Sequence, residues 1–75
     1  MSNDSKYLKF LAKHIDKLRR ERELSFQQMA LACDMDKSQV YVLCTKGANI
    51  TFLTAIKVAK GLDVSITELF DLGKI

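Results

Sequence analysis

The sequence predicts an all-α protein, a compact bundle of five helices, from three observations. The chain contains no proline, the residue that most strongly interrupts helices. Apolar residues recur at spacings of three and four, the period of one helical face. Serine, threonine or aspartate precedes four of the apolar runs, as helix N-cap residues do. The 75 residues make one small domain, with room for a compact core but not for a deep active site.

The first helix is expected from Tyr7 to Arg22. Its apolar residues fall on one face, and its other side is basic; the two sets are Leu8, Leu11, Ile15 and Leu18, and Lys9, Lys13, Lys17 and Arg20. We expect His14 at the flank of this helix, without a catalytic role. Residues 1–6 are expected to be a flexible N-terminus, and residues 7–75 a single domain.

Two short helices follow. Ser25 and Gln28 have the spacing of a capping box, in which each side chain bonds a free amide at a helix start, so a helix is expected from Phe26 to Cys33. Asp36 and Gln39 repeat that spacing eleven residues later, which predicts the next helix at about 37–45. The two helices are therefore joined by a turn of about three residues.

Two more helices complete the bundle. Thr51 precedes the segment FLTAIKVAKGL, in which Leu53, Ile56, Val58 and Ala59 have helical spacing and which Gly61 is expected to end. The pair Ser65 and Glu68 caps a final short helix with the sequence ITELFDL.

Charge is unevenly distributed along the chain. Residues 1–25 contain seven Lys or Arg and four Asp or Glu, which accounts for the whole net charge of +3. A protein with a positively charged N-terminal part and an otherwise neutral chain is suited to binding a polyanion. The simpler interpretation is a basic helix that is only exposed to solvent.

Composition argues against several other classes of protein. Cys33 and Cys44 are too few for a disulfide framework and cannot form a zinc site with one histidine. We expect both thiols to be reduced and buried, with a redox-sensing pair as the alternative. No stretch reaches the about 18 apolar residues of a membrane span, and the start MSNDSK lacks a signal peptide's apolar region, so a cytoplasmic location is expected. No catalytic constellation is apparent, and we expect neither an enzyme nor a cofactor.

A basic first helix followed by two short helices that are joined by a tight turn is the arrangement typical of the helix-turn-helix. From Ile15 to Phe70 the chain resembles the Cro and phage-repressor type of helix-turn-helix, also called the xenobiotic response element (XRE) family, with its lambda-repressor-like DNA-binding domain. The segments LRRERELSFQQMA, SQVYVL and NITFLTAIKVAKGLDVSITELF carry this resemblance. It implies that Ala30 allows a close helix crossing and that Val40 and Leu43 face the core.

The chain departs from this family at three positions. Asp34 stands where the family usually has a turn glycine, so a left-handed backbone there would carry some strain. Phe26 replaces a glutamine that touches phosphate. Cys44 replaces a glutamate that pairs with an arginine at the position of Arg19, which leaves Arg19 either free to reach a phosphate or paired with Glu23 one turn away.

The resemblance implies a sequence-specific regulator of transcription, a repressor, that binds a palindromic operator in double-stranded DNA as a homodimer. The helix at about 37–45 would be the recognition helix. Its expected base contacts are Lys37, Ser38, Gln39, Tyr41 and Val42, and the expected phosphate contacts are Arg19, Gln27 and Lys46.

Apolar residues suggest both a dimer and an alternative function. The C-terminal part has more apolar residues than a small core needs. We expect the dimer interface to consist of Phe52, Phe70, Leu72 and Ile75. Leu69 is expected in the core. Alternatively, outward-facing Tyr41 and Val42 would dock a toxin or other protein partner, as in an antitoxin or adaptor.

Overall fold

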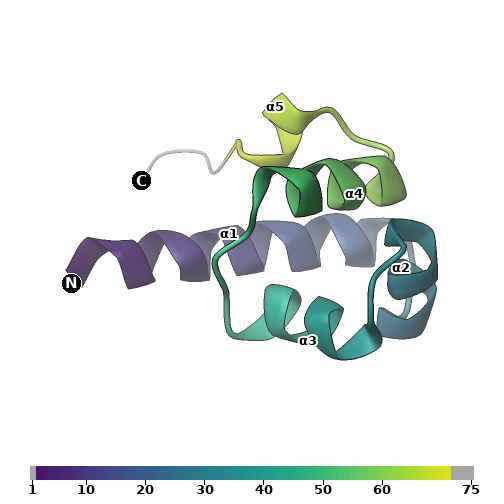
Figure 1. The fold of residues 1–75 in the computed structure, drawn as a ribbon, viewed down its shortest axis with the longest axis horizontal. Coiled ribbons are helices and arrows are strands. Elements are labelled where there is room, and N and C mark those ends of the chain that lie inside the picture. Colours follow the sequence, from purple (N-terminus) through teal and green to yellow (C-terminus); the bar gives the residue numbers. More distant parts are fainter. Residues whose placement is uncertain (1, 72–75) are drawn as a thin grey trace.

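The computed structural model describes residues 2–71 and confirms an all-α architecture (Figure 1). The five helices are α1 (Ser2–Glu21), α2 (Phe26–Cys33), α3 (Lys37–Thr45), α4 (Phe52–Leu62) and α5 (Ile66–Leu69). None of the described helices is both long and apolar enough to cross a membrane.

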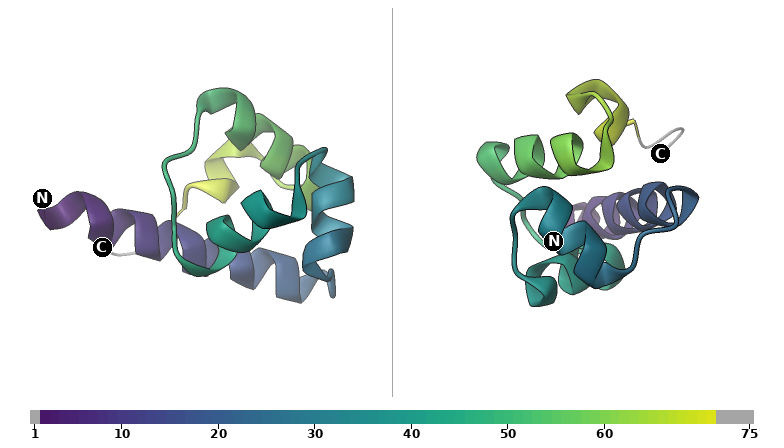
Figure 2. Two further views of the ribbon diagram at one scale, coloured as in Figure 1. Left: turned by 60° about the horizontal axis from the view of Figure 1, so that its bottom comes forward. Right: turned by 90° about the vertical axis from the view of Figure 1, so that its right-hand side faces the viewer.

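The helices form a bundle built around α1. The molecule measures 33 × 22 × 22 Å, and its long axis follows α1, which extends past the other helices at its N-terminal end (Figure 2). Helix α3 packs on α1, α2 packs on both α3 and α4, and α5 packs on α4. The Nε2–H of His14 donates a hydrogen bond of 2.8 Å to the carbonyl oxygen of Glu68, which also ties α1 to α5.

The core lies between these helices and consists of apolar side chains from all five. Val40 is fully buried, as are Leu69 of α5 and Ile15 of α1, and Ala30 and Leu43 are also buried. The predictions that Val40, Leu43 and Leu69 face the core are therefore confirmed. These contacts fix α3 on the bundle and determine which of its faces remains outside.

The first helix starts five residues earlier than predicted, at Ser2 instead of Tyr7. Residues 2–6, expected to be part of a flexible N-terminus, belong to α1. The apolar period could not reveal this extension, because that part of the helix projects beyond the bundle (Figure 1) and has no core to face.

The fourth helix also differs from the prediction. Gly61 does not end it: α4 continues to Leu62, and Asp63 closes it in the left-handed region with φ 58°. A Cβ atom at Gly61 would overlap Cys33 Sγ and lie 2.9 Å from Cys33 Cα, so this glycine permits the close crossing of α2 and α4.

The buried face of α4 is also different. Ala55, Val58, Ala59 and Leu62 are buried, whereas Leu53 is 64% exposed and Ile56 is only partly buried. The periodic pattern allowed two overlapping faces here, and packing on α2 and α5 selects one of them.

Candidate nucleic-acid interface

Helix α3 presents one side to solvent. Asp36 is its N-cap, and the Oε1 atom of Gln39 accepts a hydrogen bond of 3.3 Å from the Asp36 amide. Val40, Leu43 and Cys44 face the core. The opposite side of the helix is consequently available for binding.

The predicted base-contact residues all lie on this available side or its flanks. Lys37, Ser38, Gln39 and Tyr41 are exposed, and Val42 is half-buried. Sequence reasoning omitted Thr45, which is exposed one turn after Tyr41 and whose hydroxyl donates to the Tyr41 carbonyl oxygen at 2.6 Å. Its spacing of four from Tyr41 is the signal that could have identified it.

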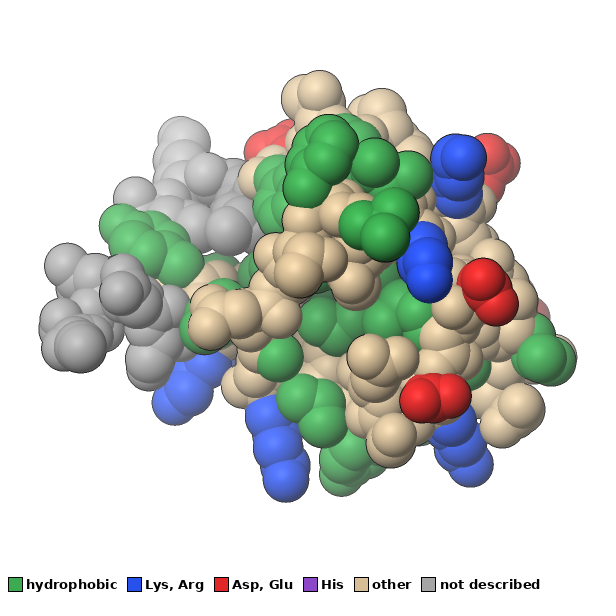
Figure 3. Space-filling model, viewed as in Figure 1, with side chains coloured by type: hydrophobic (Ala, Val, Ile, Leu, Met, Phe, Trp, Pro, Cys, Tyr) green, Lys and Arg blue, Asp and Glu red, His purple; other side chains and the backbone are tan. Residues whose placement is uncertain are grey.

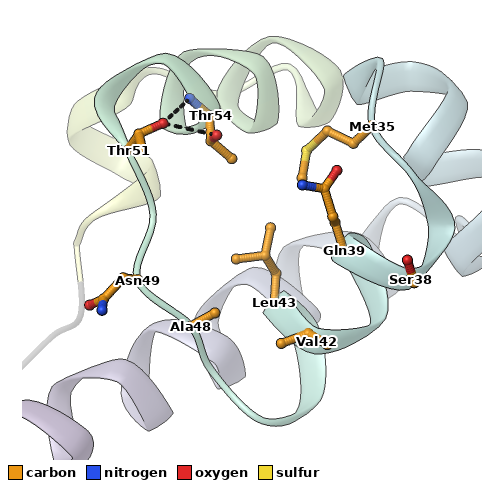
Figure 4. A pocket seen from close by; sticks show the side chains of 9 residues that line it. All are labelled: Met35, Ser38, Gln39, Val42, Leu43, Ala48, Asn49, Thr51 and Thr54. Carbon is orange, nitrogen blue, oxygen red and sulfur yellow. Dashed lines mark hydrogen bonds between the residues drawn. The ribbon is translucent and has the colours of Figure 1, made fainter.

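A groove borders α3 on the side of α4 (Figure 4). Its volume is about 440 Å³. Leu43 points into it from α3, and Thr51, the N-cap of α4, accepts a hydrogen bond of 3.1 Å from the Thr54 amide at its far edge. The lining side chains are all uncharged: Met35, Ser38, Gln39, Val42, Leu43, Ala48, Asn49, Thr51 and Thr54. Gln39 and Val42 thus lie on the side of α3 that borders the groove.

The other flank of α3 is aromatic. The rings of Tyr41 and Phe26 meet edge to face, with centroids 5.4 Å apart and planes at 77°. The guanidinium carbon of Arg19 lies 4.3 Å from the centroid of the Phe26 ring. Residues from α1, α2 and α3 therefore form one stack beside the exposed face of α3.

Arg19 has protein partners that sequence reasoning did not assign. Its Nη2 and Nε atoms lie 2.7 and 3.0 Å from Asp16 Oδ1, and its Nη1 donates to the Leu24 carbonyl oxygen at 2.6 Å. The expectation that Arg19 is either unpaired or bound to Glu23 is wrong: Asp16, three residues earlier on α1, supplies the carboxylate. With its side chain 14% exposed, Arg19 is occupied within the protein and poorly placed for phosphate.

Cys44 lies beside this ion pair, and its thiol is neutral at physiological pH. Burial raises the pKa of Cys44 from 9.0 to about 11, and the carboxylate of Asp16 adds to the effect. Burial alone raises the pKa of Cys33 to about 11. Both cysteines are free and buried, as predicted, and a protonated thiol is a poor nucleophile and metal ligand.

An exposed lysine lies at each end of α3. Lys37 begins the helix and Lys46 follows its last residue, and both are exposed, as is Gln27 at the start of α2. Figure 3 shows Lys and Arg side chains spaced along the lower edge of the molecule, where Figure 1 places α3. Among the described ion pairs on α1, Asp16 also binds Arg20 at 3.0 Å, so the basic excess of α1 is partly neutralised.

The predicted dimer residues lie on separate helix ends. Phe52, the first residue of α4, is 72% exposed, and Phe70, just after α5, is 41% exposed. Leu72 and Ile75 lie outside the described residues. Leu53, which the sequence analysis grouped by helical spacing with the buried Val58, joins Phe52 as an exposed apolar side chain.

Comparison with known proteins identifies the class. A family model described as Helix-turn-helix matches residues 15–69, more than half of the chain. The chain therefore belongs to this helix-turn-helix family of the XRE type, a class of DNA-binding transcription regulators.

Among the described residues, no group of three His, Cys, Asp or Glu side chains could hold a metal ion.

One solved structure in particular is similar. It is the restriction-modification controller protein C.AhdI from Aeromonas hydrophila, with a TM-score of 0.78 and 26% sequence identity. The match covers 83% of this chain and 94% of C.AhdI. No curated protein sequence matches the chain significantly.

Proposed function

We propose that this protein is a repressor that binds a palindromic operator as a homodimer and reads it with α3. The observation that carries the proposal is the exposed face of α3, held outward by the buried Val40 and Leu43 and flanked by two exposed lysines. An α-helix fits the major groove, where each base pair presents a distinct set of donors and acceptors.

The side chains of that face suit direct reading. Lys37 can donate to the acceptors of guanine, Ser38 can meet several base edges, and a valine methyl can contact thymine. Lys46 follows α3 and Gln27 lies at the start of α2, and both are exposed; there they would hold phosphates and set the register.

The proposed dimer follows from the small size of the reading surface. One helix of nine residues contacts only a few base pairs, and a pair of helices one DNA turn apart doubles the contact. Phe52 and Leu53 offer an exposed apolar surface that a second copy could cover. C.AhdI, as a controller protein of the same fold, supports a regulatory role.

The same apolar surface supports a second candidate function, binding to a different protein. Phe52 and Leu53 are the observation in its favour, because they are more exposed than Tyr41. Tyr41 and Val42 support this alternative less well, since Tyr41 packs on Phe26 and Val42 is half-buried.

Selection of bound duplexes from a random pool tests the proposal. A random segment of about 20 base pairs accommodates two half-sites one helical turn apart. The expected result is an enriched sequence with two-fold symmetry. Enrichment of no sequence would reject operator reading and favour the protein-binding alternative, and enrichment of a single asymmetric half-site would reject the palindrome.

Analytical ultracentrifugation tests the dimer separately. The parent protein should sediment as a dimer at tens of micromolar, and Phe52→Ser should shift it toward monomer without lowering its helix content. A parent that remains a monomer with and without the enriched duplex would contradict the proposed assembly.

A further inference from the structure

Phe26 occupies an unusual place between the framework and the reading surface. It is the first residue of α2 and is only partly buried, packed against the core from outside. Arg19 of α1 covers its ring at 4.3 Å, and Tyr41 of α3 meets the ring at 5.4 Å. Phe26 is thus the link between a charged pair on α1 and a side chain predicted to touch DNA.

The framework end of this stack is firmly held. Arg19 makes two contacts with Asp16 Oδ1, at 2.7 and 3.0 Å, and donates to the Leu24 carbonyl at 2.6 Å. Charge-assisted bonds of this length are among the stronger hydrogen bonds in proteins. A guanidinium restrained at three points also restrains the aromatic ring on which it lies.

The outer end of the stack is open to solvent. Tyr41 is 47% exposed, and no described residue forms a hydrogen bond with its hydroxyl. Its ring is nevertheless restricted by the edge-to-face contact with Phe26. A side chain that is already ordered loses less conformational freedom on binding than a free one.

We propose that Phe26 is a positioning residue for DNA reading: it holds Tyr41 in the orientation in which the Tyr41 side chain contacts the operator. The inference rests on the proposed function, because Tyr41 must meet DNA. In this proposal Phe26 acts through its edge-to-face contact with the Tyr41 ring. Replacing Phe26 should therefore affect operator binding only while Tyr41 is present.

A double-mutant cycle measures this dependence. Its members are the parent, Phe26→Leu, Tyr41→Ala and the double variant, and Phe26→Tyr is a control that keeps the ring. Each is titrated with the duplex that the parent enriches from a random pool and with a random-sequence duplex of equal length. Phe26→Met replaces Phe26→Leu if the latter does not fold.

The expected coupling free energy between Phe26 and Tyr41 equals the interaction energy of one aromatic pair. Phe26→Leu should weaken binding to the enriched duplex by about 2- to 10-fold and leave binding to the random duplex nearly unchanged. In the Tyr41→Ala background the same substitution should have no further effect. Phe26→Tyr should bind like the parent.

A spectroscopic measurement reports the orientation without DNA. The chain contains two tyrosines and no tryptophan, so 3-fluorotyrosine labelling gives two ¹⁹F signals, which Tyr7→Phe assigns. Phe26→Leu should shift and broaden the Tyr41 signal only, because Tyr41 loses its neighbouring ring.

Two outcomes would overturn the inference while the proposed function stands. One is an additive cycle, in which Phe26→Leu weakens both duplexes equally and does so with or without Tyr41; that result would make Phe26 a stabilising residue only. The other is an unchanged Tyr41 ¹⁹F signal in Phe26→Leu. If the parent enriches no duplex, the proposed function itself fails, and this inference fails with it.

Discussion

Asp34 forms the turn between α2 and α3 in a conformation that most residues avoid. Its φ and ψ are 55° and 52°, in the left-handed region where a Cβ atom is strained and glycine is not. The amide of Met35 donates to the Ala30 carbonyl at 2.9 Å and closes the end of α2. Asp34 thus has the left-handed backbone for which the sequence analysis considered a strain cost, and aspartate is tolerated because its short side chain is among those that adopt this region.

Substitution of Asp34 tests the cost of this turn. Asp34→Gly should raise the free energy of unfolding by up to about 1 kcal/mol, since relief of strain outweighs the added freedom of the unfolded chain. Asp34→Ala should lower it, because alanine keeps the Cβ atom and loses the polar group. Urea denaturation measures both; a glycine variant less stable than the alanine variant would contradict the account.

The two buried cysteines predict an alkaline loss of stability. Burial raises the pKa of Cys33 from 9.0 to about 11, so above pH 9 the unfolded chain releases this proton before the folded chain does. The contribution to the free energy of unfolding is therefore complete below pH 9 and is lost as pH rises to about 11.

Comparison with Cys33→Ala isolates this effect from the ionisation of lysine and tyrosine. Urea denaturation should give a constant stability difference between the parent and the variant from pH 6 to 8, and a parent advantage that shrinks between pH 9 and 11. A difference that remains constant to pH 11 would show that the thiol is not kept neutral by burial.

At the scale of elements, most of the helices could be predicted because their ends carry local signals. The hydroxyl of Ser25 accepts from the Gln28 amide at 3.0 Å, and Ser65 does the same for Glu68 at 3.0 Å. Such bonds depend on spacing alone. The start of α1 lacked any periodic signal. Gly61 was wrongly predicted to end α4, because this glycine instead permits close contact between α2 and α4.

The candidate site could be predicted in part, chiefly from the resemblance to the helix-turn-helix family. That resemblance separated the buried Val40 from the exposed Lys37. The position of Phe26 against Tyr41 and Arg19 depends on how three helices pack, which no local pattern specifies. Asp16, by contrast, lies three residues before Arg19 on the same helix, and this spacing could have identified it as the partner of Arg19.

The crossing of α2 and α4 gives a prediction at this scale. Gly61→Ala should lower the free energy of unfolding by roughly 1–3 kcal/mol, although alanine is the better helix former. The added Cβ atom would meet the backbone of Cys33 at 2.9 Å, and a backbone cannot rotate away. Lys60→Ala, at an exposed neighbouring position, should be nearly neutral; equal thermal stability of the two variants would refute the close crossing.

At the scale of the whole molecule, the distribution of charge determines how binding depends on salt. The ion pairs of Asp16 reduce the contribution of α1, so the phosphate contacts are expected from the ends of α2 and α3, where Gln27 and Lys46 are exposed. Because Arg19 is paired with Asp16, we expect Gln27 and Lys46, instead of Arg19, to contact phosphate.

The salt dependence of DNA affinity tests this distribution. Lys46→Ala should reduce the slope of log K against log salt by about 0.9 for each phosphate that Lys46 neutralises, with the same reduction on every DNA sequence. Arg19→Ala should instead lower thermal stability, because it leaves Asp16 without its main partner. Lys60→Ala removes the same charge from α4 as a control, and an equal change in slope for Lys60→Ala and Lys46→Ala would mean that only net charge matters.

We propose that the exposed face of α3 reads base pairs. The most direct measurement is the affinity of Lys37→Ala and Lys46→Ala for a set of duplexes that differ from the selected operator at single base pairs. Lys37→Ala should lose about 1–3 kcal/mol of discrimination at one base pair in each half-site, while Lys46→Ala weakens all duplexes alike. If folded Lys37→Ala ranks every duplex as the parent does, α3 does not read the operator through its first turn and the account is contradicted.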